Sequence, residues 1–168
     1  TLPLDRYHGG HLGVGLHASI RFGQRQRGYL GGGPRLHYRG LRFHDSDGTG
    51  SSETTLAIHQ FGPEGNFLIG GGNKQVVGLF SARLGLGLHA DRGATRLGIT
   101  TTDVRRNALG GWALGGVMVL GKLSPRWSLG GHAEAGVLGS TGGGPLAFLM
   151  EIGLNVAWHF GAGRRIGI

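Results

Sequence analysis

Apolar residues alternate one by one with small or polar residues along several segments of this chain. Between His11 and Phe22, every second residue from Leu12 onward is apolar, and the intervening positions carry His, Gly, Ser and Arg. A strand places successive side chains on opposite faces and a helix does not, so this segment is expected to be a strand with one apolar face. The same alternation recurs at 76–90, 127–138 and 148–160.

Four further segments alternate less strictly and raise the expected number of strands to eight: 35–43, 54–61, 95–104 and 109–121. The alternation in the first of them changes phase at Gly40, which predicts a β-bulge. Residues 91–94 and 122–125 have the composition of tight turns. Three longer connections are expected: 23–34, 44–53 and 62–75. The second of these lies where an up-and-down barrel has short turns, so a further strand pair around 67–69 is an open alternative.

Glycine fills 38 of the 168 positions, about three times its usual share. Each glycine in a helix costs up to about 1 kcal/mol relative to alanine, which argues against a helical fold. The chain has no cysteine and therefore no disulfide, and no apolar run reaches the length of a transmembrane helix. Its net charge of +8 suits anionic partners such as phospholipid and the phosphates of lipopolysaccharide. With the strand pattern, we expect these lipids rather than nucleic acid.

The two faces of the predicted strands differ in a way that favours a membrane barrel. The polar face is rich in glycine, which suits the crowded interior of a narrow barrel, and it has few of the Lys, Glu and Thr residues of a water-exposed face. The apolar face carries aromatic residues that are expected to form two belts at the membrane interfaces. One belt comprises Trp127, Trp158 and Phe160, and the other comprises Phe22, Trp112 and Phe148. The alternative is a soluble β-sandwich with these aromatics in its core.

The sequence therefore predicts a single domain over 1–168, an all-β, eight-stranded antiparallel up-and-down transmembrane β-barrel. The barrel would occupy about 11–160, and 161–168 would form a short C-terminal tail. Residues 152–160, with apolar residues at every second position and a final Phe160, resemble the C-terminal β-signal of outer-membrane proteins. In its pattern the whole chain resembles small barrels of the OmpA/OmpX/OmpW type. It departs from them in the eight residues that follow Phe160.

That resemblance implies a bacterial outer-membrane location and recognition by the barrel assembly machinery during biogenesis. It implies a structural or anchoring role, as a lipopolysaccharide-contacting protein or as a subunit of a complex with other envelope proteins. Two alternatives remain open from the sequence. One is a narrow outer-membrane pore, and the other is a lipid A-modifying barrel enzyme that would use His, Ser and Glu residues.

Four charged residues are expected at one height inside the barrel: Arg21, Arg83, Glu134 and Glu151. A turn between Gly142 and Gly143 would place Glu134 opposite Glu151 on neighbouring strands. Buried charges must be paired, so this belt is interpreted as a salt-bridged plug, with a gated pore as the alternative.

Basic residues outside the belt are candidates for contacts with lipid phosphates: Arg25, Arg27, Arg164 and Arg165. Solvated charge at the rim is the alternative for all four. For an enzyme, His17 with Ser19 and His132 with Glu134 share strand faces, but these pairs would point into the interior rather than toward lipid. We expect no catalytic residues, no metal site and no cofactor.

Overall fold

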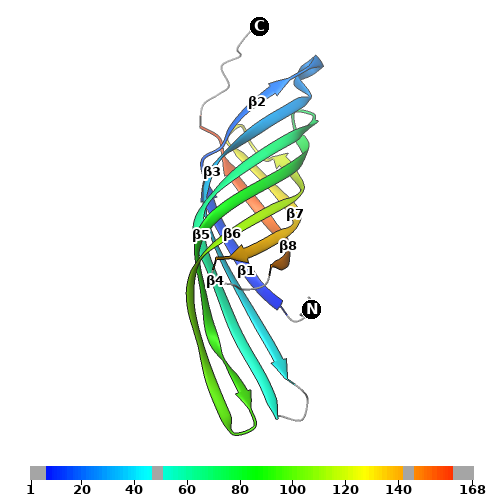
Figure 1. Ribbon diagram of the computed structural model, residues 1–168. Coiled ribbons are helices and arrows are strands. Elements are labelled where there is room, and N and C mark those ends of the chain that lie inside the picture. The colour runs from blue at the N-terminus through cyan, green and yellow to red at the C-terminus, as the bar shows by residue number, and fades with distance from the viewer. Residues whose placement is uncertain (1–6, 47–50, 142–145, 161–168) are drawn as a thin grey trace.

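The computed structural model describes residues 7–46, 51–141 and 146–160, which form one antiparallel sheet of eight strands (Figure 1). The all-β prediction is confirmed. The strands are β1 (Tyr7–Gly15), β2 (Ala18–Phe22), β3 (Gly28–Ser46), β4 (Ser52–Gly72), β5 (Val76–Leu97), β6 (Thr100–Lys122), β7 (Trp127–Ser140) and β8 (Ala147–Trp158). A short 3₁₀ turn, η2 (Gln24–Gln26), connects β2 to β3. Among the described residues, no helix is both long and apolar enough to cross a membrane.

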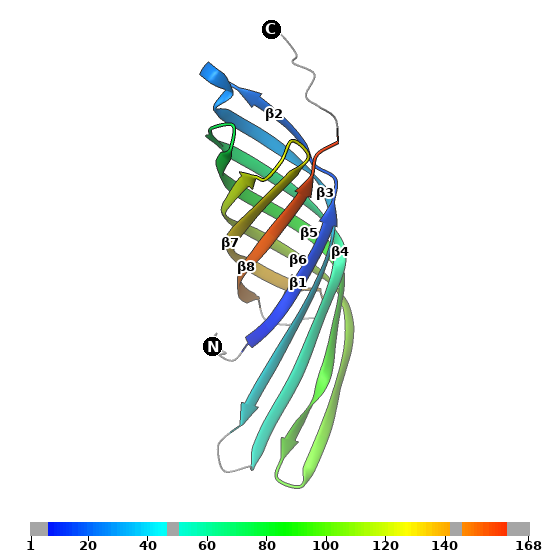
Figure 2. The ribbon, with the colours of Figure 1, turned by 180° about the vertical axis from the view of Figure 1, so that it is seen from behind.

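The sheet curls so that β8 returns toward β1, but the described residues form no ladder between these two strands (Figure 2). The predicted closed antiparallel barrel is therefore not what the structure contains. The reason lies in the strand order, β1-β3-β4-β5-β6-β7-β8, which has seven positions because β1 and β2 pair with successive parts of β3. With every neighbouring pair antiparallel and an odd number of positions, the two edge strands run in the same direction.

The predicted first strand, 11–22, is interrupted between Gly15 and Ala18. The interruption lies opposite Pro34 of β3, whose carbonyl accepts a hydrogen bond from the Leu16 backbone N at 3.0 Å. Proline has no backbone N–H, so it cannot return the second bond of the antiparallel pattern at this point. The single strand predicted over 11–22 therefore corresponds to two strands, β1 and β2, which share one position in the sheet.

Several predicted boundaries are also corrected. The tight turn predicted at 122–125 is found at 123–126, between β6 and β7, where Ser124 Oγ accepts hydrogen bonds from the backbone N of Arg126 and of Trp127. The turn at 91–94 is wrong, because both ladders of β5 run through it to Leu97. Much of 23–34 and 62–75 is strand, with 67–69 inside β4. The predicted connection 44–53 has residues 47–50 outside the described part.

No bulge occurs at Gly40, which pairs in continuous register with Gly10 on one side and His59 on the other. The apparent change of phase arises because β3 turns Arg39, Leu41 and Phe43 to the same concave face. That face accepts apolar as well as charged residues, so a change of residue type along it does not imply a change of register.

The hairpins β3–β4 and β5–β6 extend well beyond the other strands at the lower end of Figure 1. The ladder between β5 and β6 continues to Leu97 and Thr100, whereas the β6–β7 ladder covers β6 only from Gly110 onward. The other end of the sheet has short connections, including 73–75 and 123–126. The molecule therefore has one end with short turns and one end with a long two-hairpin extension.

The two faces of the curled sheet have opposite character. Most of the large side chains on the convex face are apolar and exposed, such as Leu86 at 71%, Ile152 at 81% and Leu154 at 82%. The concave face buries polar and charged side chains: His37, Arg39, Gln60, Glu64, Ser81, Arg83, His89, Ser128, His132, Glu134 and Glu151. Near the short turns it also buries an apolar cluster: Tyr29, Leu68, Val77, Leu79 and Met118.

The aromatic residues gather at one end more than the sequence predicted. Trp127 and Trp158 are cross-strand partners whose rings meet edge to face with centroids 4.5 Å apart, and Phe160 lies beside Trp158. Phe148, at the other end of β8, is half exposed on the convex face. Phe22 was expected at the same end of the barrel as Phe148. It lies instead at the rim of the tryptophan pair, because β2 and β8 run in the same direction.

Trp112 was expected in a convex-face belt and is instead buried on the concave face, 4% exposed. In β6 it alternates in phase with Leu114 and Met118, which are also buried. Its cross-strand neighbour is Gly85, where an added Cβ would lie 2.2 Å from the indole ring. The absent side chain at Gly85 therefore leaves the space that the Trp112 ring occupies.

Candidate functional site

Five charged residues meet on the concave face, one each from β3, β4, β5, β7 and β8. They are Arg39, Glu64, Arg83, Glu134 and Glu151, here called the inner ionic cluster, and none is more than 5% exposed. Because an isolated charge is very costly to bury, their positions relative to one another determine whether this interior is stable.

The strand register brings the carboxylates of the last hairpin together. Glu134 of β7 pairs directly with Glu151 of β8, which confirms the predicted partnership. On the other side of β7, Glu134 pairs with Gly116, which in turn pairs with Ser81 of β5. Arg83 lies two residues from Ser81 and therefore on the same face of β5. This short row places a guanidinium within reach of two neighbouring carboxylates.

Arg83 is the centre of the inner ionic cluster. Its Nη2 contacts Glu134 Oε2 and Glu151 Oε2, and its Nη1 donates to Glu64 Oε1 at 3.4 Å. The Ser81 hydroxyl donates to Glu134 Oε1 at 2.5 Å. One buried guanidinium therefore joins carboxylates from three strands, and the planar group supplies several fixed donors for this purpose.

Arg39 links the cluster to β4 and β5. Its Nε donates to Glu151 Oε1 at 2.6 Å, and its Nη1 donates to Gln60 Oε1 at 2.7 Å. The Gln60 side chain continues to His89 Nδ1 at 3.2 Å, and His89 Nε2 lies 2.7 Å from Asp91 Oδ1. The guanidinium of Arg39 also lies over the Trp112 ring, 5.6 Å from its centroid. These contacts form a continuous polar path across three strands.

Glu64 occupies the other side of Arg83. Trp112 Nε1 donates to its Oε2 at 3.0 Å, Arg35 Nε lies 3.4 Å from its Oε1, and His37 Nδ1 lies 3.6 Å from its Oε2. Arg35 is the outermost of these partners, with a side chain 15% exposed. With Arg35 included, three guanidinium groups face three carboxylates, so the formal charge of the assembly is balanced.

This arrangement is suited to filling the interior. All three carboxylates of the inner ionic cluster are ion-paired. Removing one partner of a buried pair leaves an uncompensated charge at a cost of about 3–5 kcal/mol. The side chains therefore hold one another in place across five strands.

The structure brings together three of the four residues predicted for the charge belt, Arg83, Glu134 and Glu151. Arg21 does not join them. It lies exposed on β2, donates from Nη1 to the Asn73 carbonyl at 3.1 Å, and has its guanidinium 6.0 Å from the Tyr29 ring centroid. The error has the same origin as that for Phe22, since β1 and β2 run toward the short-turn end, in the same direction as β8.

Sequence reasoning missed Arg39 and Glu64. Arg39 stands immediately before the apparent change of phase at Gly40, and Glu64 stands between Pro63 and Gly65, in a segment interpreted as a connection. The inward position of Arg39 follows from its alternation with His37 and Leu41, so an unbroken strand over 35–43 would have placed it correctly.

The remaining predicted residues lie apart from the inner ionic cluster. Arg25 and Arg27 are exposed between β2 and β3, while Arg164 and Arg165 lie outside the described residues. His17 Nε2 is 2.8 Å from the Tyr29 hydroxyl. An enzyme that used His17 and Ser19 would instead need a contact between those two side chains. His132 Nδ1 is 2.7 Å from the Asn155 amide.

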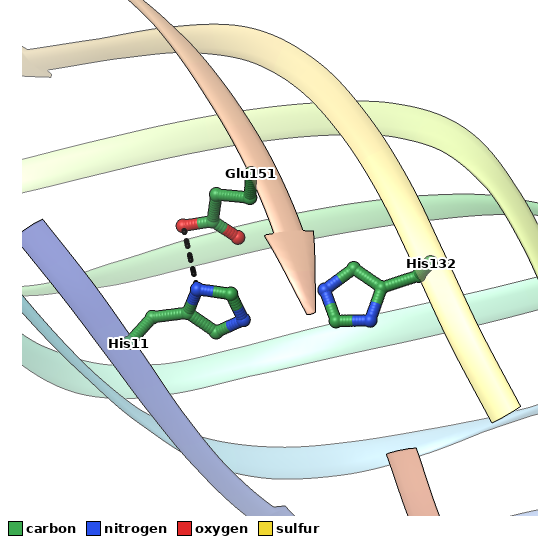
Figure 3. Close-up of side chains that lie close together, drawn as sticks. All are labelled: His11, His132 and Glu151. Atoms are coloured by element: carbon green, nitrogen blue, oxygen red, sulfur yellow. Dashed lines mark ion pairs between the residues drawn. The ribbon is translucent and has the colours of Figure 1, made fainter. Parts of the chain in front are cut away.

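One group of side chains at the edge of the cluster has the composition of a metal site. His11 of β1, His132 of β7 and Glu151 of β8 each offer a donor atom, and these atoms lie within 4.8 Å of one another (Figure 3). Figure 3 shows the carboxylate of Glu151 beside the His11 ring, with the His132 ring next to them.

No protein-family model, curated protein or solved structure shows significant similarity to this chain. The resemblance to OmpA/OmpX/OmpW-type barrels therefore stays a prediction from the sequence pattern. The functional argument depends on the geometry of the sheet and of its two faces.

Proposed function

We propose that this chain is a small outer-membrane protein with a structural or anchoring role, whose curled sheet closes in the bilayer around a filled interior. The observation that carries the proposal is the inverted distribution of side chains. The convex face exposes large apolar residues, whereas the concave face buries charged ones. A water-soluble sheet protein has the opposite arrangement, and a membrane barrel has this one.

The exposed apolar residues cover most of the convex face rather than a small patch. They come from every strand that borders the inner ionic cluster and include Leu36 on β3, Phe61 on β4, Leu84 on β5 and Met150 on β8. Each square ångström of such surface removed from water contributes roughly 25 cal/mol, so contact with lipid would stabilise the fold strongly. Soluble monomers rarely expose apolar patches of more than a few hundred square ångströms.

The aromatic residues at the short-turn end support the same placement. Trp127, Trp158 and Phe160 lie together there, and Trp and Tyr are enriched where a membrane protein crosses the interface. The exposed guanidinium groups of Arg25 and Arg27 lie in the β2–β3 connection at that end, where they would reach lipid phosphates. Outer-membrane lipid is the partner that this end suits, and lipopolysaccharide would be the partner at the opposite end, where the hairpins are long.

A bilayer would require the open edges of the sheet to be satisfied. Unpaired backbone groups in hydrocarbon cost several kcal/mol each, so we propose that β1 and β8 come together there. Because these strands run in the same direction, the closing ladder would be parallel. Assembly of such a seam is a step for which the barrel assembly machinery is suited, and the alternating residues that end at Phe160 would be the segment it recognises.

The inner ionic cluster would close the interior of this barrel to ions. Arg83 alone contacts carboxylates from three strands, so a conducting path would require several buried ion pairs to break together. We therefore propose a plugged barrel rather than a narrow pore.

Gel migration with and without heating tests the membrane assignment. The chain should partition with the detergent phase, and the unheated protein should migrate differently from the boiled protein, because a membrane barrel resists SDS until heated.

A matched pair of variants sharpens the test. Leu86→Arg, on the convex face, should weaken insertion, with an expected cost of about 2–4 kcal/mol at mid-membrane depth, whereas Arg42→Ala, at an exposed position, should not. A soluble, heat-insensitive wild type would contradict the proposal.

A further inference from the structure

We propose that His11, His132 and Glu151 bind one divalent transition-metal ion of the zinc class, and that this ion joins the two open edges of the sheet. The three residues come from β1, β7 and β8, so an ion held by them would connect the first strand to the last hairpin. The inference rests on the concave-face geometry and goes beyond the proposed membrane role.

The donor atoms already converge. One donor atom from each of the three residues lies within 4.8 Å of the other two, and the rings of His11 and His132 have their centroids 5.4 Å apart. Zinc–ligand bonds of about 2.0–2.2 Å require tetrahedral ligands roughly 3.4 Å apart, so modest side-chain rotation would complete the site. Figure 3 shows that the two rings and the carboxylate face a common space.

Gly153 creates that space. It is the cross-strand partner of His132 on β8, and an added Cβ would lie 2.6 Å from His132 Cε1 and 3.0 Å from its Nε2. The same Cβ would lie 3.1 Å from His11 Nε2. The Nε2 atoms of both histidines are therefore directed to one point beside Gly153, where any larger residue would intrude.

An unpartnered nitrogen points to a ligand at this position. His132 is 7% exposed, and its buried Nε2 has no hydrogen-bond partner. Its Nδ1 lies 2.7 Å from Asn155 Nδ2. The proposal requires the Asn155 amide to flip, so that Oδ1 accepts the Nδ1 proton and the lone pair of Nε2 is directed into the gap. A hydrogen bond of this kind to the second ring nitrogen is typical of metal-binding histidines.

The donor set selects the class of ion. Two imidazoles and one carboxylate suit zinc and its neighbours, whereas calcium and magnesium prefer oxygen ligands. Glu151 Oε1 contacts both Nε and Nη2 of Arg39, and Oε2 contacts Nη2 of Arg83. A carboxylate has about four lone-pair sites, so one site on Oε2 remains for the ion. The nearby guanidinium groups oppose a cation, so we expect micromolar affinity, weaker than that of structural zinc sites.

Calorimetric titration of ZnCl₂ into the chelator-treated, tag-free chain, folded in detergent micelles, tests the proposal. We expect one ion per chain. His132→Gln should weaken binding by at least about 100-fold, and Asn155→Ala by about 10–100-fold. Gly153→Ala should abolish binding with every donor retained. His59→Ala, which changes an exposed histidine bonded to Tyr38, should leave binding unchanged.

Cobalt(II) provides a second measurement on the wild type that does not depend on how the variants fold. A tetrahedral site of nitrogen and oxygen donors should give intense visible absorption, which should disappear when excess zinc is added. Circular dichroism of each variant verifies that the sheet is retained. The proposal is overturned if the wild type shows no such absorption, or if a folded Gly153→Ala variant binds zinc as tightly as the wild type does.

Discussion

Glu134 and Glu151 lie directly opposite each other on β7 and β8, and Arg83 of β5 contacts both carboxylates. Two like charges at adjacent cross-strand positions are destabilising by themselves. The guanidinium converts this repulsion into attraction, and Ser81 and Arg39 supply further donors. The last hairpin is therefore attached to the middle of the sheet through its charges as well as through its backbone.

We expect Arg83→Ala to reduce the free energy of unfolding by about 3–5 kcal/mol, because three carboxylates would lose a common partner. Glu134→Ala should also destabilise the fold, and the double variant should cost less than the sum of the single changes. Urea unfolding of the micelle-bound chain measures all three. The exposed Arg42 provides a control, since Arg42→Ala should change stability by less than about 0.5 kcal/mol.

Strictly additive effects of Arg83→Ala and Glu134→Ala would contradict the contact between the two side chains. Conductance of the wild type and of the same variants in planar bilayers tests whether the interior lets ions pass. The wild type should show no discrete openings, and a wild type that conducts readily would favour the pore.

Cysteine pairs across the seam test whether β1 and β8 meet in the bilayer. The chain has no cysteine of its own, so Leu12→Cys combined with Ile152→Cys introduces a single possible disulfide between two exposed convex-face positions. Disulfides form only when the Cα atoms lie about 4.4–6.8 Å apart. If the seam closes, mild oxidation of the vesicle-inserted protein should produce a cross-linked band that moves differently from the reduced form.

Leu12→Cys combined with Leu97→Cys is the control, because Leu97 lies at the far tip of the β5–β6 hairpin and should not cross-link. Absence of cross-linking for Leu12 with both Ile152 and Leu154, in protein that has inserted, would show that the edges stay apart.

The three tryptophans should respond differently to brominated lipid. Trp127 and Trp158 are 41% and 43% exposed on the convex face, whereas Trp112 is 4% exposed on the concave face. A variant that retains only Trp112 should keep its fluorescence in brominated vesicles, and variants that retain only Trp127 or only Trp158 should be quenched. Strong quenching of the Trp112 variant would place that ring among the lipid chains and contradict its position in the structure.

Period-two alternation was enough to predict an all-β fold, because side-chain direction in a strand depends only on sequence parity. The sequence also predicted that Glu134 and Glu151 are cross-strand partners, since the position of the turn sets the register of the last hairpin. It could not predict the number of sheet positions. That number is seven because the turn expected at 91–94 is part of β5, and because 100–104 and 109–121, expected in two strands, both lie in β6.

The same limit explains the errors at single residues. Trp112 was assigned outward because it is aromatic, but its orientation is determined by the phase of β6 and by the space left at Gly85. Glu64 was missed because Pro63 and Gly65 have the composition of a loop, although β4 runs through both. Local composition suggests where a chain turns, whereas ladders on both sides of a strand can keep it extended regardless.

The β3–β4 and β5–β6 hairpins are longer than the proposed membrane-spanning part requires. A bilayer is crossed by about 9–11 tilted residues, and β6 has 23. Beyond Leu109, no described residue of β7 pairs with β6, and this border of β6 carries Thr100, Thr101, Thr102, Asp103, Arg105 and Arg106. Charges and hydroxyls along an uncovered border discourage the stacking of one chain on another. In the proposed membrane orientation, the extension would therefore project into water as a separate surface, accessible to large molecules that do not contact the lipid.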